Sequence, residues 1–123
     1  MEAQTSCMVG HFMNKSERKV LIVLVTASSP KEAAKIGQAV VKKKVAACVN
    51  IVSDVTSIFR WQGKVQRSRE ALLLVKTTEA RYAAVERLIR SLHSYEVPEI
   101  IALKISKGLG RYTAWVERET TRN

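Results

Sequence analysis

The feature that most constrains the fold is a nearly unbroken strand-like stretch from Val45 to Trp61, followed by a turn signal at Gln62-Gly63. At about 3.3 Å per residue, a straight strand of this length reaches about 56 Å. A domain of this size has a radius of gyration of only about 13 Å, so we expect the hairpin to overhang its own core. A bend or bulge at Ser53-Asp54 would shorten that reach.

An overhanging hairpin would expose unpaired strand edges together with Val, Ile, Phe and Trp side chains. Both are a liability for a monomer, because open edges invite pairing and large apolar patches favour association. Pairing with the hairpin of another copy is the simplest way to cover these edges and apolar side chains. We therefore predict a homo-oligomer that is held largely by its hairpins.

Strand-like and helix-like segments follow the order β-α-β-β-α-β and end in a further helix. At the first helix start, Ser29 can cap the helix and Glu32 can complete a capping box. The order predicts an α+β fold of the ferredoxin-like type, in which two helices cover one face of a four-stranded antiparallel sheet. The predicted strands are Val20–Val25, Val45–Val52 with its continuation to Trp61, Glu70–Thr77 after a return over Lys64–Arg69, and Glu99–Ile105. The predicted helices run from Ser29 to Lys44, from Thr78 to Leu92, and from Arg111 to Glu119 with Tyr112, Trp115 and Val116 facing inward.

Composition narrows the class of protein. The chain has 123 residues, and we expect a flexible tail over 1–19 and a single domain over 20–120. Its hydrophobic content of 46% is too high for a disordered chain, and no apolar run is long enough for a membrane-spanning helix, so we predict no membrane partner. Two cysteines, Cys7 and Cys48, are too few for a disulfide scaffold. Nothing at the N-terminus is typical of an export signal, so a cytoplasmic location is the expectation.

The sequence contains few residue combinations that are typical of catalytic sites, and we predict that the protein is not an enzyme. No Ser/His/Asp order and no phosphate-binding P-loop occurs. Gly108-Leu109-Gly110 is typical of a plain turn before a helix. A small hydrolase of the acylphosphatase type would need an arginine in the loop after the first strand, and Thr26–Pro30 contains none.

Four basic residues gather at the hairpin, and the net charge of +10 permits an anionic partner. These residues can bind phosphate or nucleic acid, or they can simply protect a strand edge. An RNA-recognition module of the same element order would present aromatic side chains on its third strand, and Glu70–Lys76 has none. We therefore predict no nucleic-acid partner. The four basic residues are Arg60, Lys64, Arg67 and Arg69.

The loop from His93 to Glu99 combines a histidine, a tyrosine and two carboxylates. A neutral imidazole can bind a transition metal, so His93 is a candidate ligand. The alternative is a structural role, in which His93 caps the preceding helix and Tyr95 packs in the core.

The order of several separate motifs resembles the CutA family, the divalent-cation-tolerance proteins. The resemblance covers about Val20 to Val116 and implies a ferredoxin-like trimer whose extended hairpins pair between subunits. It also implies a link to copper and other divalent metals without an established catalytic activity. The motifs are Val45–Ile51, Thr56–Lys64, Leu74–Thr77, His93–Ile101 and Tyr112–Trp115.

The resemblance implies two kinds of site. Some members of the family offer a cysteine and adjacent histidines as soft-metal ligands, at positions that match Val25 and Leu92-His93 here, so His93 remains as the ligand for Cu²⁺ or another divalent cation. The family also suggests a cleft between subunits that can hold a small anionic ligand, which makes a metabolite sensor similar to the trimeric nitrogen-signalling proteins the alternative function. In that cleft, Trp61 and Trp115 can instead be interface core, and Lys76 can form a structural ion pair. The matching cleft residues are Arg60, Trp61, Lys64, Lys76, His93, Tyr95, Glu99, Tyr112 and Trp115.

Overall fold

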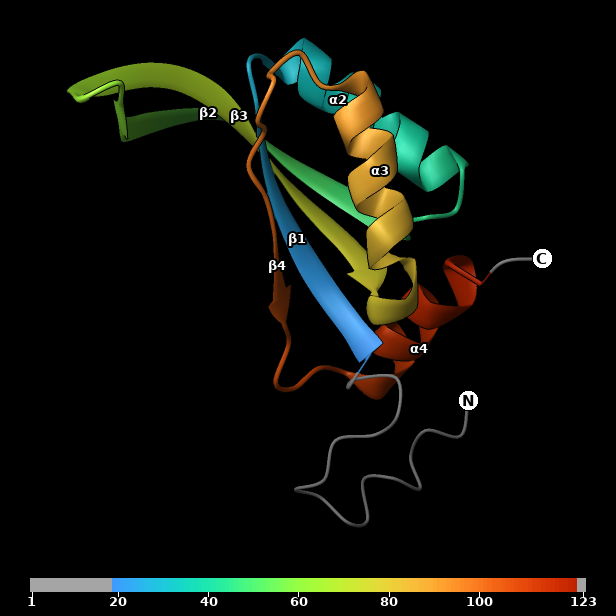
Figure 1. Ribbon diagram of the computed structural model, residues 1–123. Coiled ribbons are helices and arrows are strands. Elements are labelled where there is room, and N and C mark those ends of the chain that lie inside the picture. Colours follow the sequence, from blue (N-terminus) through green and yellow to red (C-terminus); the bar gives the residue numbers. More distant parts are fainter. Residues whose placement is uncertain (1–18, 122–123) are drawn as a thin grey trace.

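The computed structural model describes residues 19–121. Four strands form one antiparallel sheet in the order β2-β3-β1-β4, and helices α2 and α3 lie side by side on one of its faces (Figure 1). The predicted α+β architecture is therefore confirmed. Within this part of the chain, no helix is long and apolar enough to cross a membrane. The predicted tail, apart from its last residue, lies outside the described residues together with Cys7 and His11.

The first strand and helix form where the sequence predicts them. β1 (Val20–Ala27) is a run of mostly apolar residues that pairs with strands on both of its sides. α2 (Pro30–Lys42) begins at Ser29, whose Oγ accepts a hydrogen bond of 3.1 Å from the Glu32 backbone N–H. The predicted capping box is wrong in one respect, because the Glu32 carboxylate reaches one residue further back. It accepts hydrogen bonds from both the backbone N–H and the hydroxyl of Ser28.

The long hairpin consists of β2 (Cys48–Trp61) and β3 (Lys64–Thr78). Its outer part leaves the body of the molecule, as the green and yellow ribbons at the upper left of Figure 1 show. Gln62 and Gly63 have φ angles of 52° and 79°, the left-handed pair that a tight two-residue hairpin turn requires. The predicted overhang is confirmed.

The bounds of the hairpin strands differ from the prediction. Lys64–Arg69 belongs to the same strand as the residues that follow, because β3 pairs with β2 from Lys64 to Glu70 and again, beyond the bulge, from Leu72 into the body. The buried residues 45–47 precede β2 instead of starting it. The register shifts between Val52 and Val55, so β2 has a bulge at the predicted place.

The second half of the chain repeats the strand-helix alternation. A short 3-10 turn, η2 (Glu79–Arg81), leads into α3 (Tyr82–Leu92), so the second α-helix begins later than predicted. β4 (Ile100–Lys104) forms the edge of the sheet beside β1, and α4 (Gly110–Glu119) follows it. In α4, Val116 is buried and Trp115 partly buried, whereas Tyr112 is 41% exposed, so its predicted inward position is wrong.

The main core lies between α2, α3 and one face of the sheet. α2 and α3 contribute buried residues at helical spacing, and β1 and β3 contribute every second residue. Gly37 allows α2 to approach β2 closely, because a Cβ there would lie 3.3 Å from Val49 Cγ1. The core residues are Val23, Val25, Ala27, Ala33, Ile36, Val40, Val45, Ala46, Ala71, Leu73, Val75, Val85 and Ile89.

The other face of the sheet carries apolar side chains that α2 and α3 do not cover. Directly opposed residues of antiparallel strands share a face, so the register assigns each side chain. We call this surface the open face. It comprises Ile22 and Leu24 of β1, Val52 of β2, Leu72 and Leu74 of β3, and Ile101 and Leu103 of β4.

The bulge in β2 extends the open face onto the hairpin. It inserts one extra residue on β2 between Val52 and Val55, which reverses the side that each following residue faces. Val55 therefore opposes Glu70 and lies on the open-face side. Phe59 and Trp61 then lie on the same side as Val55, and they are 43% and 58% exposed. Without the extra residue, a period of two would turn these aromatic side chains to the other face.

Candidate functional site

The structure places the predicted cleft residues in three separate groups. One group is at the hairpin tip, one in the loop after α3, and one near α4. Lys64 and Lys76 lie on the same strand, and at about 3.3 Å per residue their positions are about 40 Å apart along it. A single chain therefore does not bring the predicted cleft together.

The group at the hairpin tip is exposed to solvent. The Arg60 guanidinium donates a hydrogen bond of 3.4 Å to the Gly63 carbonyl, which holds it across the turn. Trp61 opposes Lys64, so an aromatic side chain and a basic side chain project from neighbouring positions on the open-face side. This group offers cations and an aromatic surface to whatever lies beside the tip.

The group near α4 is built around Lys76. Its ammonium group donates a hydrogen bond to Asn50 Oδ1 and lies 3.9 Å from Cys48 Sγ. Lys76 therefore has polar partners on β2, and among residues 19–121 it forms no ion pair with a carboxylate. The Tyr112 and Trp115 rings lie 5.6 Å apart, centroid to centroid. Burial raises the pKa of Tyr112, and the adjacent Cys48 raises it further.

Sequence reasoning missed Cys48 and Asn50 as members of this group. The available signal was their spacing, because residues two apart on a strand share a face. Register with β3, which the sequence does not reveal, places both beside Lys76.

The His93 side chain is fully buried, and both of its ring nitrogens have partners. Nε2 lies 2.7 Å from the Thr26 carbonyl oxygen, which can only accept, so Nε2 carries the proton. Nδ1 accepts a hydrogen bond of 3.0 Å from the Tyr95 backbone N–H. The imidazole thus joins the loop to the end of β1, in the arrangement of a structural histidine.

Two carboxylates hold the same loop. Glu32 Oε2 accepts a hydrogen bond of 2.8 Å from the Ser94 backbone N–H. Burial acts to raise the pKa of Glu32, but hydrogen bonds from Ser28 and Ser94 outweigh it and lower that pKa to about 2. On the other side, the Tyr95 hydroxyl donates a hydrogen bond of 2.6 Å to Glu70 Oε2. Burial, together with the Glu70 and Glu32 charges, raises the pKa of Tyr95 to about 12.

These contacts tie the loop to the root of the hairpin. Glu70 stands opposite Val55, immediately beyond the bulge where the hairpin leaves the body. Tyr95 thus links the loop to the position from which the hairpin projects. The sequence gives no signal for the Tyr95–Glu70 contact, because the two residues are 25 positions apart. Glu99, the third predicted residue of this loop, is exposed.

The residues of one chain do not fit a metal site. Val25 and Leu92 supply no ligand atom at the positions where the resemblance places one. The Nδ1 lone pair of His93 is already used by the Tyr95 N–H. Across residues 19–121, no group of three His, Cys, Asp or Glu side chains converges on a point that could hold a metal ion.

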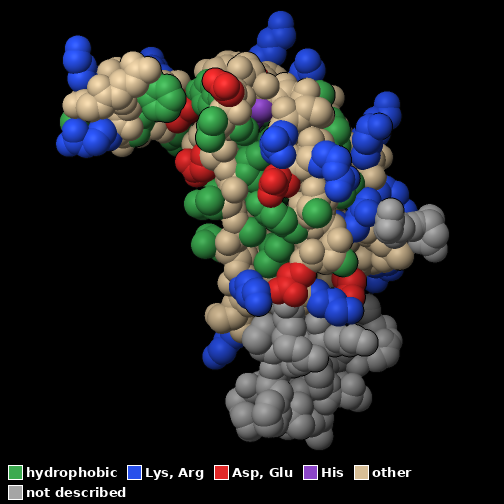
Figure 2. Space-filling view, viewed as in Figure 1, with side chains coloured by type: hydrophobic (Ala, Val, Ile, Leu, Met, Phe, Trp, Pro, Cys, Tyr) green, Lys and Arg blue, Asp and Glu red, His purple; other side chains and the backbone are tan. Residues whose placement is uncertain are grey.

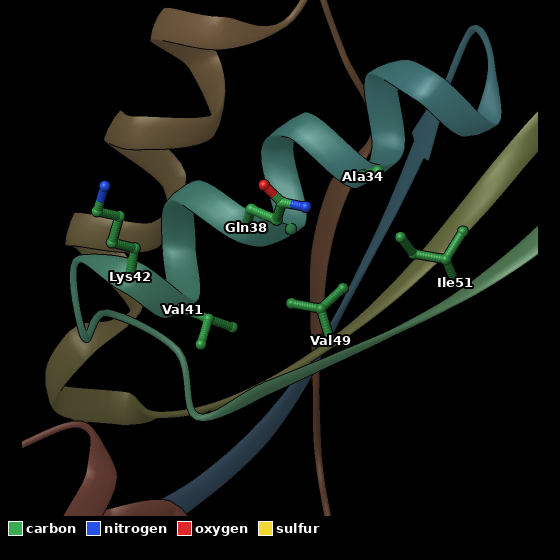
Figure 3. A pocket seen from close by; sticks show the side chains of 7 residues that line it. Ala34, Gln38, Val41, Lys42, Val49 and Ile51 are labelled. Carbon is green, nitrogen blue, oxygen red and sulfur yellow. The ribbon is translucent and has the colours of Figure 1, made fainter.

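A groove of about 520 Å³ lies between α2 and β2 (Figure 3). Its floor and walls are mainly apolar, with Val41 from the helix facing Val49 and Ile51 from the strand. Gln38 and Lys42 are the only polar side chains that line it. None of the predicted cleft residues lies there, and the groove lacks the convergent polar groups that are typical of a small-molecule site.

Together these features define a small α+β protein with a projecting hairpin and an apolar sheet face that α2 and α3 leave open. A sequence profile described as CutA1 divalent ion tolerance protein matches residues 21–119. The chain belongs to the CutA1 family.

Individual relatives agree with this assignment. The divalent-cation tolerance protein CutA of Thermus thermophilus is 46% identical over 99 residues, which are 80% of this chain and 96% of the relative. Protein CutA of Mus musculus is 41% identical over 101 residues, but the match spans only 57% of that longer protein.

Solved structures show the same fold. The structure of the divalent cation tolerance protein from Thermus thermophilus superposes with a TM-score of 0.81 at 44% identity, over 83% of this chain and 99% of that one. CutA1 from Oryza sativa gives a TM-score of 0.83 at 34% identity, over 89% of this chain and 100% of that one.

Proposed function

We propose that this protein is a cytoplasmic homotrimer that serves divalent-cation tolerance by binding or signalling rather than by catalysis. The family supplies the link to divalent-cation tolerance. The strand order β2-β3-β1-β4 with antiparallel pairing supports the ferredoxin-like topology within this proposal.

The observation that carries the proposal is the open face and its continuation onto the hairpin. Ile101 and Leu103 on β4 are 52% and 51% exposed, and Trp61 on the hairpin is 58% exposed. Hydrophobic side chains also protrude beside β4 in Figure 2. Contiguous apolar surface of this kind is typical of an interface, because its burial is favourable by roughly 25 cal/mol per Å².

A second copy is the partner that this surface fits. β2 and β3 carry part of the open face and continue into the hairpin, so a closed ring of copies can bury the face and pair the hairpin at the same time. This arrangement also removes the exposed strand edge that a lone hairpin presents.

Assembly also provides the route by which the three groups of cleft residues meet. In one chain the Lys64 and Lys76 regions are far apart on β3. In a trimer, the hairpin tip of one copy can reach the α4 region of another and bring Arg60, Trp61 and Lys64 towards Lys76 and Tyr112. A divalent cation such as Cu²⁺ is the ligand of the proposed function, with His93 as its candidate residue. The basic side chains of the clefts favour a small anionic ligand, which is the ligand of the alternative function.

Titration calorimetry on the assembled protein tests the binding role. Cu²⁺ and Zn²⁺ are compared with a panel of nucleotides and small carboxylates, and we expect heat from the cations. Loss of that heat in His93→Ala and His93→Gln, with circular dichroism unchanged, would assign the cation to His93. Heat that persists in both variants would place it elsewhere in the cleft.

The same panel of compounds distinguishes cation binding from the alternative function, the sensing of a small anionic metabolite. Binding of an anionic metabolite that Lys76→Met abolishes, with no cation heat, would make the protein a metabolite sensor and overturn the cation proposal. No heat from any compound in the panel would contradict a binding role altogether.

A further inference from the structure

The outer surface of the helix layer is strongly basic. On α2, Lys31, Lys35 and Lys42 follow one another at helical spacing. The buried residues of that helix, such as Ile36 and Val40, lie on the opposite side, so the three lysines form a stripe that faces solvent.

Helix α3 adds to the same surface. Arg87 and Arg90 are three residues apart, and both are exposed, whereas Val85 and Ile89 of that helix are buried. Because α2 and α3 lie side by side, the two sets of cations share one layer (Figure 1). Lysine and arginine side chains stand out from this side of the molecule in Figure 2.

Carboxylates do not neutralise this layer. Glu32 is engaged by Ser28 and Ser94. Burial raises the pKa of the Tyr82 hydroxyl, and Glu86 lies close enough to raise that pKa further. Among residues 19–121, none of the five cations of the layer is in an ion pair with a carboxylate. Lys31 also lies in the first turn of α2, where the positive end of the helix dipole disfavours a cation.

The arrangement is therefore unfavourable for the isolated helix. Like charges four residues apart, such as Lys31 and Lys35, repel each other. An anionic partner would remove both this repulsion and the unfavourable interaction with the dipole. The layer lies opposite the open face, so it stays accessible when that face is buried, and its role does not depend on the proposed function.

We propose that the layer formed by Lys31, Lys35, Lys42, Arg87 and Arg90 binds an acidic helical segment of a partner protein. Glutamate or aspartate at the same helical spacing would face the lysine stripe residue for residue. At 1.5 Å per residue, the three lysines span about 16 Å, the length of about three turns of a partner helix.

The side chains of the layer disfavour other polyanions. Single-stranded nucleic acids bind through aromatic stacking, and the exposed aromatic residues Phe59, Trp61 and Tyr112 all lie outside α2 and α3. Helices that lie on a membrane surface insert Trp, Phe or Leu side chains. On these two helices, the only large apolar side chain among the exposed ones is Val41.

Fluorescence anisotropy tests the proposal with a labelled helical peptide that carries glutamates at the spacing of the lysine stripe. The full-length protein is measured at about 0.15 M ionic strength, where surface charges are screened beyond about 8 Å. We expect Lys31→Glu/Lys35→Glu/Lys42→Glu to weaken binding by about tenfold or more, which corresponds to about 1.4 kcal/mol.

The control variant is Lys107→Glu/Arg111→Glu/Arg118→Glu, which makes the same change in net charge outside the layer. We expect it to weaken binding by less than about threefold, because Arg111 and Arg118 lie on α4 and Lys107 precedes it, outside the layer. Equal weakening by both variants, or no binding by the unmodified protein, would overturn the proposal.

Two further probes decide the kind of partner. A DNA duplex and vesicles that contain phosphatidylserine are titrated under the same conditions. Tighter binding to either of them than to the peptide, lost in the helix variant but kept in the control, would overturn the assignment to a protein partner.

Discussion

Replacing Ile101 and Leu103 by lysine tests whether the open face is an interface. Both residues lie on β4, the edge strand, and their register with Leu24 and Ile22 of β1 places them on the open face. Each is about half exposed in the single chain, so each can lose further apolar surface when a second copy covers it.

The expected magnitude follows from that exposure. Full burial of a leucine or isoleucine side chain contributes about 1.5–3 kcal/mol, so burying the exposed half contributes about 1 kcal/mol. Two such residues in each of three subunits amount to about 6 kcal/mol of assembly free energy. A lysine at either position removes this contribution and adds the cost of burying a charge. The fold of the single chain changes little, because exposed substitutions usually cost less than about 0.5 kcal/mol.

Sedimentation velocity is the assay, with far-UV circular dichroism as the check on folding. We expect Ile101→Lys/Leu103→Lys to sediment as a folded smaller species where the unmodified protein sediments as a trimer. The matched control is Val41→Lys/Ala83→Lys, which adds the same charges at exposed positions of α2 and α3, on the side opposite the open face. A variant that assembles like the unmodified protein, or a control that dissociates as readily, would refute the reasoning.

The remaining predictions concern the loop and the hairpin turn. Tyr95→Phe removes the hydrogen bond to Glu70 and should lower the free energy of unfolding by about 1–2 kcal/mol, as measured by urea denaturation. An unchanged urea midpoint would contradict a stabilising role for this hydrogen bond. Because the pKa of Tyr95 is raised to about 12, its contribution to stability should be present below pH 10 and lost as the pH rises through 12, which alkaline unfolding of the two proteins would reveal. Glu32→Gln should cost about 1–2 kcal/mol at pH 7. Since the pKa of Glu32 is lowered to about 2, the difference from the unmodified protein should shrink as the pH falls from 4.5 towards 2, and a difference that is constant with pH would argue against the carboxylate charge as its source. Gly63→Ala meets no atom within 4 Å but has a φ of +79°, so it should destabilise the turn by about 1 kcal/mol in thermal unfolding, while Gln62→Asn should be neutral or stabilising.

Much of the fold could be predicted because its determinants are local. The apolar run of β1 and the Ser29-Pro30 start of α2 each specify an element within a few residues. The Gln62-Gly63 turn likewise fixes the hairpin. The bounds were less predictable. Lys64–Arg69 is polar except for Val65, and it is a strand because β2 supplies its hydrogen-bonding partners.

The candidate site was harder to predict because it depends on contacts between distant residues. The sequence singles out His93 as a candidate metal ligand, but its burial and its hydrogen bond to Thr26 arise from packing across 67 positions. The partners of Lys76 follow from strand register, which the sequence pattern alone does not fix. The basic stripe of α2 could be read from helical spacing, whereas its lack of carboxylate partners required the structure.

The most direct test of the central claim is the mass of the unmodified protein in solution, measured by size-exclusion chromatography with multi-angle light scattering. One chain has a mass of 13.8 kDa, so a homotrimer has three times that mass, 41.4 kDa. Assembly through the open face and the hairpin predicts 41.4 kDa across the elution peak at micromolar concentration. A stable, folded species of 13.8 kDa would contradict it.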